Sequence, residues 1–97
     1  MMHLVVFDIA DDRLRARVGT ACLDAGLVRV QYSAYRGDLS PARRRRLEQR
    51  LVRLTAQSEG CDIQIYSLCQ QDFAAHVRYT DGVLVNDQPV APEVVVY

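Results

Sequence analysis

A single carboxylate interrupts the most hydrophobic segment of the chain. Asp8 follows apolar residues 4–7 and precedes Ile9. A charge within such a run must be neutralised, paired or placed at an exposed end of its element. One interpretation is a ligand for a divalent cation, because Mg²⁺ binds one or two carboxylates together with a substrate phosphate. The other is a cap for the loop or helix that begins at residues 9–12, and the sequence leaves both open.

Arginine supplies all the strong positive charge, because the chain has no lysine. Residues 1–53 hold eleven arginines and six acidic residues, whereas residues 54–97 hold one arginine and six acidic residues. The planar guanidinium suits two-pronged contacts to phosphate, so this distribution indicates nucleic-acid binding. The candidate contacts on two predicted helices are Arg13, Arg15, Arg17, Arg43, Arg46, Arg50 and Arg53. The alternative is a solvated helix face with pairs such as Arg44 and Glu48.

The remaining reactive side chains form no recognisable catalytic pattern. Tyr32 and Tyr35 either stack on bases or pack within a strand. His3 and His76 have no metal-ligand spacing, and no Ser–His–Asp, Cys–His or glycine-rich phosphate loop is present. Covalent hydrolysis is therefore not expected. Three cysteines without a C-x-x-C pair favour structural thiols over a disulfide framework or a zinc site.

Alternating strands and helices would position these groups. Apolar patterning predicts strands within residues 3–9, 27–37 and 62–68 and helices at about 12–25 and 41–58. Gly26 is expected to end the first helix in a left-handed conformation, and Ser40 with Pro41 to begin the second. The side-chain alternation of residues 27–37 slips by one residue, which predicts a tight turn or bulge near residues 31–33. Residues 70–80 fit either a helical turn or a short strand.

The order of these elements predicts an α+β fold. It matches a ferredoxin-like βαββαβ sandwich with an additional C-terminal strand, in which two helices cover one face of an antiparallel sheet. The length of 97 residues, with 49% hydrophobic and 25% charged residues, fits one domain over residues 1–97. The chain lacks both an apolar run near the roughly 20 residues that cross a bilayer and the pattern of a signal peptide. We therefore expect a cytoplasmic protein without membrane contact.

The C-terminal residues contain three consecutive valines at positions 94–96. A strand this apolar with a free edge invites aggregation, so it should be paired. We expect residues 89–97 to form a C-terminal strand that adds to the sheet of a second copy in a homodimer. The alternative is that the tail folds back on its own domain.

Several segments, in order, carry a resemblance to a known family. They are Phe-Asp-Ile-x-Asp at residues 7–11, Val-Gln-Tyr-Ser-Ala-Tyr at 30–35 and Asp-Ile-Gln-Ile-Tyr at 62–66, with the arginines of 13–17 and Gly26 between them. At these distances, over residues 3–69, the chain resembles the CRISPR-associated endoribonuclease family, the small dimeric partner of the spacer integrase.

The resemblance implies a ferredoxin-like homodimer whose C-terminal strand pairs across the dimer. It also implies that Asp8 lies near its symmetry mate and binds Mg²⁺ as the catalytic residue of a metal-dependent endonuclease or endoribonuclease. A further implication is an architectural role, in which the dimer bridges integrase subunits and holds short duplex DNA by shape for spacer integration. Single-stranded RNA is the other substrate that the family implies.

Two departures from the family pattern bear on these roles. Phe7 stands where tyrosine is frequent, and Arg36–Gly37 stands where a Phe-Glu-like pair often follows the serine. The missing acidic residue favours the scaffold role over the nuclease. We expect the arginine rows to flank the two Asp8 carboxylates. The alternative function is a non-catalytic ferredoxin-like interaction or regulatory module without nucleic-acid binding, in which Asp8 is a cap.

Overall fold

The computed structural model describes residues 1–85, so the strand predicted at residues 89–97 lies outside the described part. Strands and helices follow one another along the chain as the sequence predicts. In chain order they are β1 (Met2–Ile9), α1 (Asp12–Asp24), β2 (Val28–Gln31), β3 (Ala34–Asp38), α2 (Pro41–Thr55), β4 (Cys61–Leu68), α3 (Gln70–Ala75), β5 (Arg78–Thr80) and β6 (Val83–Val85).

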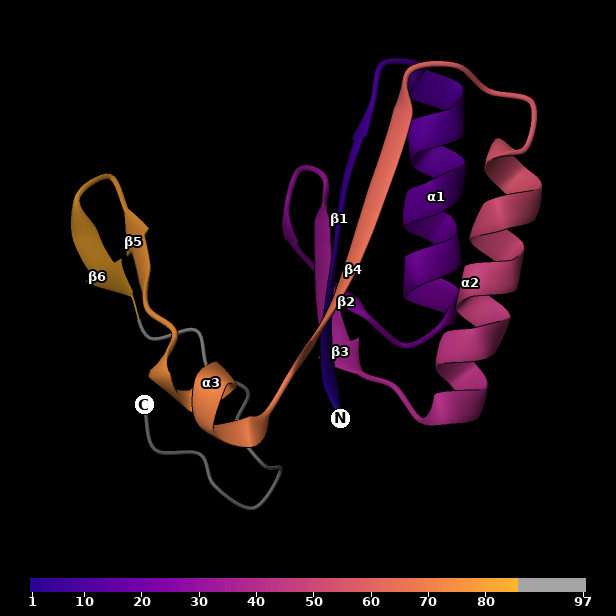
Figure 1. Cartoon of the computed structure of the whole chain (residues 1–97). Coiled ribbons are helices and arrows are strands. Elements are labelled where there is room, and N and C mark those ends of the chain that lie inside the picture. Colours follow the sequence, from indigo (N-terminus) through magenta and orange to yellow (C-terminus); the bar gives the residue numbers. More distant parts are fainter. Residues whose placement is uncertain (86–97) are drawn as a thin grey trace.

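Four of the strands form one antiparallel sheet in the order β2-β3-β1-β4. Figure 1 shows α1 and α2 side by side on the same side of this sheet. The first strand is thus central, and each helix joins two strands that are consecutive in sequence but are not neighbours in the sheet. This is the ferredoxin-like α+β arrangement, which confirms the predicted fold class.

The helix boundaries follow from local capping. Asp11 caps α1, since its Oδ1 accepts a hydrogen bond of 2.8 Å from the backbone N–H of Leu14. Gly26 has a φ of +96°, the left-handed conformation that ends the helix without a side-chain clash. Ser40 caps α2 by accepting from the N–H of Arg43 at 3.2 Å, and Pro41 is the first helical residue. The predictions for Gly26, Ser40 and Pro41 are confirmed, although α2 ends at Thr55, slightly earlier than expected.

The predicted irregularity between β2 and β3 is also present. The pairing register shifts between Arg29 and Gln31, and residues 32–33 form the turn. The backbone N–H of Phe7 donates to the carbonyl of Ser33 at 3.0 Å, so this turn is attached to β1. The bulge therefore fixes the turn beside the C-terminal end of the central strand.

The hydrophobic core lies between the sheet and the two long helices. Val5, Phe7 and Ile9 of β1 are buried in one cluster with side chains of α1 and α2. A Cβ added at Gly19 of α1 would lie 2.6 Å from the hydroxyl oxygen of Tyr35, so glycine makes room for this ring, which stacks on Phe7. Burial in this core raises the pKa of the free Cys22 thiol to about 11.

Residues 70–80 contain both a helical turn and a strand, namely α3 and β5. Beyond the end of β4, α3 and the β5–β6 hairpin extend away from the sheet (Figure 1). Contact with the sheet is made at β3, where the Arg36 guanidinium lies 5.0 Å from the ring centre of Phe73. Within residues 1–85, no helix is long and apolar enough to cross a membrane.

Candidate metal centre and nucleic-acid interface

Asp8 projects from the sheet face that α1 and α2 do not cover, called here the open face. Successive side chains of a strand point to opposite faces. Because Phe7 and Ile9 are buried against the helices, Asp8 is exposed on the other side. Within residues 1–85 its carboxylate has no hydrogen-bond or ion-pair partner, and Asp11 performs the capping that the sequence also allowed for Asp8. Its carboxylate is therefore accessible from solvent.

A second carboxylate lies directly opposite Asp8 on the neighbouring strand. The register of β1 and β4 pairs Asp8 with Asp62, and both are exposed. Directly opposed residues share a face, with their Cβ atoms about 4.5–5.5 Å apart. Like charges in this arrangement destabilise a sheet, and a cation relieves the repulsion. Sequence reasoning did not assign Asp62 to the site, because only the strand register reveals its position.

This carboxylate pair, Asp8 and Asp62, is the donor set that one chain offers to a metal. Gln64 orients it in part, since its Nε2 donates to Oδ2 of Asp62 at 3.2 Å. Among the described residues, no group of three or more His, Cys, Asp or Glu side chains is arranged so that it could hold a metal ion. Two hard oxygen donors fit the demand of Mg²⁺, which keeps several waters and takes few protein ligands. They do not fit a zinc site, which needs three or four protein ligands.

The open face is also apolar. Leu4 and Val6 of β1 alternate with the core residues and are half-buried, while Val28 of β2 and Tyr66 of β4 are exposed. In the register of β1 and β4, Leu4 faces Tyr66 directly. The carboxylate pair thus lies at the end of a band of apolar side chains that α1 and α2 leave uncovered.

Six of the seven predicted arginine contacts gather between α1 and α2. A groove of about 740 Å³ is lined by four arginines of α2 and by the C-terminal turn of α1, and a second hollow continues it toward the start of α1. We call the six residues that line these hollows the arginine groove: Arg13, Arg17, Arg43, Arg46, Arg50 and Arg53. Asp24 of α1 is the acidic residue among them, and it accepts from Arg50 at 2.8 Å.

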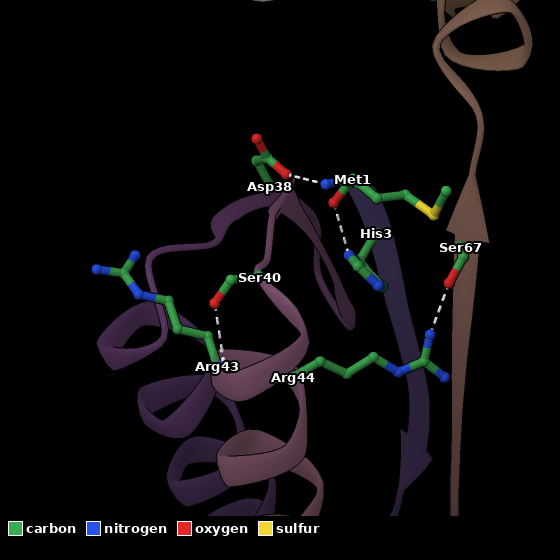
Figure 2. A network of polar contacts seen from close by, with 7 residues as sticks. All are labelled: Met1, His3, Asp38, Ser40, Arg43, Arg44 and Ser67. Atoms are coloured by element: carbon green, nitrogen blue, oxygen red, sulfur yellow. Dashed lines mark hydrogen bonds and ion pairs between the residues drawn. The ribbon is translucent and has the colours of Figure 1, made fainter.

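Adjacent arginines of α2 serve different purposes. Figure 2 shows the side chains of Arg43 and Arg44 leaving the helix in opposite directions. The Arg44 guanidinium donates to Ser67 of β4 at 2.6 Å and to Glu48 at 2.9 Å, so it joins α2 to the sheet. Arg44 therefore has a structural role, as the predicted pair with Glu48 suggested.

His3 also makes a structural contact. In the same view (Figure 2), Nδ1 of this buried side chain donates to the Met1 carbonyl at 2.7 Å.

Arg15 lies apart from the other six arginines. It projects from the opposite flank of α1, where it pairs with Asp12 and donates to the carbonyl of Ile9 at 2.8 Å. The hydrogen bond to Asp12 raises the pKa of Arg15. Its guanidinium also lies over the exposed ring of Tyr32. Tyr35, in contrast, is buried against Phe7, so only Tyr32 is available for stacking.

The sequence predicts that rows of arginines flank Asp8. This prediction is wrong for the six residues of the arginine groove, which do not lie beside Asp8. The groove lies on the helices, which cover one face of the sheet, whereas Asp8 belongs to the open face. The reason is the alternation of β1, in which the neighbours of Asp8 occupy the helix-facing positions. Residues that contact nucleic acid and residues that bind metal would therefore lie on opposite sides of one chain.

Most of the sequence matches a known family. The family described as "CRISPR associated protein Cas2" matches residues 1–75. The chain belongs to the Cas2 family. Among curated relatives, CRISPR-associated endoribonuclease Cas2 1 of Archaeoglobus fulgidus is 45% identical over 71 residues, covering 73% of this chain and 74% of the relative. An endoribonuclease Cas2 of Chloroflexus aurantiacus is 51% identical over 66 residues, covering 68% and 76%.

Two solved structures and one fused relative are also similar to this chain. A crystal structure of Streptococcus pyogenes Cas2 matches with a TM-score of 0.64 and 27% identity over 72% of this chain and 88% of that chain. A chain of a partial Cas6-RT-Cas1–Cas2 complex matches with a TM-score of 0.71 and 26% identity over 97% of this chain and 100% of that chain. A Cas1/Cas2 endonuclease fusion of Thermoproteus tenax is 35% identical over 78 residues, covering 80% of this chain and 29% of the fusion.

Proposed function

We propose that this Cas2 chain is a dimeric scaffold for CRISPR spacer acquisition, which holds duplex DNA on its helices while it assembles with a Cas1 integrase. The observation that carries the proposal is the arginine groove, in which two helices contribute six guanidinium groups to one continuous surface. The assembly with an integrase is supported by the match within a Cas1–Cas2 complex and by the fused relative.

The chemistry of the groove suits a sugar-phosphate backbone. Guanidinium groups form charge-assisted, two-pronged hydrogen bonds to phosphate oxygens. Such contacts fix the position of a duplex without reading its sequence, which suits a scaffold that must accept DNA of any sequence. Each phosphate contact releases condensed counterions, so binding should weaken steeply with salt.

Duplex binding at two salt concentrations tests this proposal. We expect a short blunt DNA duplex to bind at low salt, and the slope of log K against log salt to fall by about one for each contacting arginine removed. The test variant replaces Arg17, Arg46 and Arg53 with glutamine. The matched control is Arg44→Gln on the same helix, which leaves the groove complete. Absence of binding by the wild type at low salt contradicts the proposal and favours an interaction or regulatory module without nucleic-acid binding.

The homodimer is proposed on the open face. A monomer leaves Leu4 and Val6 partly exposed and Tyr66 46% exposed on a face that α1 and α2 do not cover, and such patches favour association. A symmetric pair that buries this face brings the second copy to the side of the sheet that carries Asp8. The second ligand set would then come from the other subunit, as the family resemblance implies.

A second role, metal-dependent phosphodiester hydrolysis, is favoured by the opposed carboxylates. Asp8 and Asp62 would hold Mg²⁺ through carboxylate oxygens, and their exposure leaves the remaining positions open to water and a substrate phosphate. When bound, Mg²⁺ supplies a Lewis acid that offsets the charge developing on a phosphoryl group. The substrate is RNA or DNA. The relatives named as endoribonucleases support this role, and magnesium-dependent cleavage that stops on chelation is its direct test.

A further inference from the structure

Two guanidinium groups converge on one exposed aromatic ring at the β2–β3 turn. Arg15 of α1 lies 5.0 Å from the ring centre of Tyr32, and Arg29 of β2 lies 5.2 Å from it. We call these three residues the Tyr32 cluster. Although both cations contact the ring, Tyr32 remains 64% exposed, so much of its surface can still contact a ligand.

Backbone contacts hold the cluster in place. Arg15 is anchored by the carbonyl of Ile9 and by Asp12, and Nε of Arg29 donates to the carbonyl of Gln31 at 3.3 Å. The turn that carries Tyr32 is bonded to β1 through Ser33 and Phe7. The ring and both cations are therefore positioned before any ligand arrives, which lowers the entropic cost of binding.

The cluster lines a shallow open depression of about 220 Å³ between α1 and the β2–β3 turn. An exposed aromatic ring with adjacent guanidinium groups offers a stacking surface for a base and partners for its phosphates. The faces of a base inside a duplex are covered by its stacking neighbours, so a base pair within the helix cannot use this surface.

We propose that the Tyr32 cluster is a binding site for an unpaired nucleotide, in a single strand or in the overhang of a duplex. The inference rests on the proposed nucleic-acid role and adds a second contact, distinct from the arginine groove. The cluster bonds to the backbone of Phe7 through the turn and of Ile9 through Arg15. These two residues flank Asp8, so the bound nucleotide lies at the end of the sheet that carries the carboxylate pair.

Fluorescence titrations with three probes test the site: a short blunt DNA duplex, the same duplex with a single-stranded overhang, and an RNA strand of the overhang sequence. The overhang and the RNA contain 2-aminopurine, whose emission is quenched on stacking. Tyr32→Leu removes the ring, and Tyr32→Phe keeps it. Tyr79→Leu is the matched control, because Tyr79 is also 64% exposed but lies on β5.

We expect Tyr32→Leu to weaken overhang binding about tenfold and to abolish the quenching, with blunt-duplex affinity unchanged. Tyr32→Phe and Tyr79→Leu should behave as wild type, and Arg29→Gln should weaken overhang binding alone. The RNA and DNA arms show which type of unpaired strand the site accepts. The inference is overturned if Tyr32→Leu loses affinity equally for both duplexes, or loses none for the overhang and the RNA. In either case, binding of the blunt duplex by the wild type still supports the scaffold proposal. Failure of the wild type to bind any probe overturns both.

Discussion

The two faces of the sheet differ in charge, in packing and in what they could bind. One face is covered by α1 and α2, whose outer surface carries six arginines in one groove. The other carries Asp8, Asp62 and an uncovered apolar band. The central strand β1 supplies both faces, with odd positions in the core and even positions on the open face. The proposed duplex contacts and the proposed metal ligands thus lie on different sides of the chain, so single substitutions should separate the two functions.

The largest effect is expected on the proposed homodimer, which associates through the open face. Leu4→Glu places an unpaired charge in the proposed dimer interface, which costs about 3 kcal/mol and raises the dimer dissociation constant more than about a hundredfold. Sedimentation velocity measures this change. The same substitution on the helix side, Leu23→Glu at a leucine that is 54% exposed, should leave the dimer intact. If both variants or neither dissociate, the open face is not the interface.

The next effect concerns metal-dependent cleavage. Asp8→Asn removes the charge of a proposed ligand while keeping its shape. Loss of a residue that merely supports a metal ligand typically costs 10–100-fold, so we expect loss of the ligand's own charge to lower cleavage by about a hundredfold. Duplex affinity should change less than about twofold, because Asp8 lies away from the arginine groove. Initial rates with Mg²⁺ and after chelation, measured beside duplex binding, check both statements. Full activity of Asp8→Asn would remove Asp8 from the site.

The smallest effect compares one charge change on each face. Asp24→Asn releases Arg50 from its 2.8 Å ion pair, and we expect duplex affinity at low salt to rise about two- to fivefold, the range of an exposed ion pair. Asp62→Asn removes the same charge from the open face and should leave that affinity unchanged. Equal gains in the two variants would mean that net charge, and not position, governs binding.

Much of the fold could be predicted from local patterns. The caps Asp11 and Ser40, the helix stop at Gly26 and the bulge before residues 32–33 each have a chemical cause within a few residues of sequence. The fold class followed from the order of the elements. Fold prediction succeeded where short-range chemistry was sufficient.

The arrangement of the site depended on information that the sequence pattern lacks. Residues 4–7 are all apolar, so their pattern does not show which side chains face the helices, and the face of Asp8 stayed open. The pairing of Asp8 with Asp62 depends on the register between β1 and β4, which a sequence separation of more than fifty residues does not fix. The separation of Arg15, in contrast, could have been predicted, because residues two apart do not share a helix face, whereas Arg13 and Arg17 are four apart and do.

The two edge strands of the sheet differ in length. Among the described strands, β2 at one edge has four residues and β4 at the other has eight. Backbone N–H and C=O groups on the outer side of an edge strand form a template for a further strand. An incoming segment would therefore gain up to twice the length of ladder beside β4 that it would gain beside β2, so the outer edge of β4 is the longer template for a further strand.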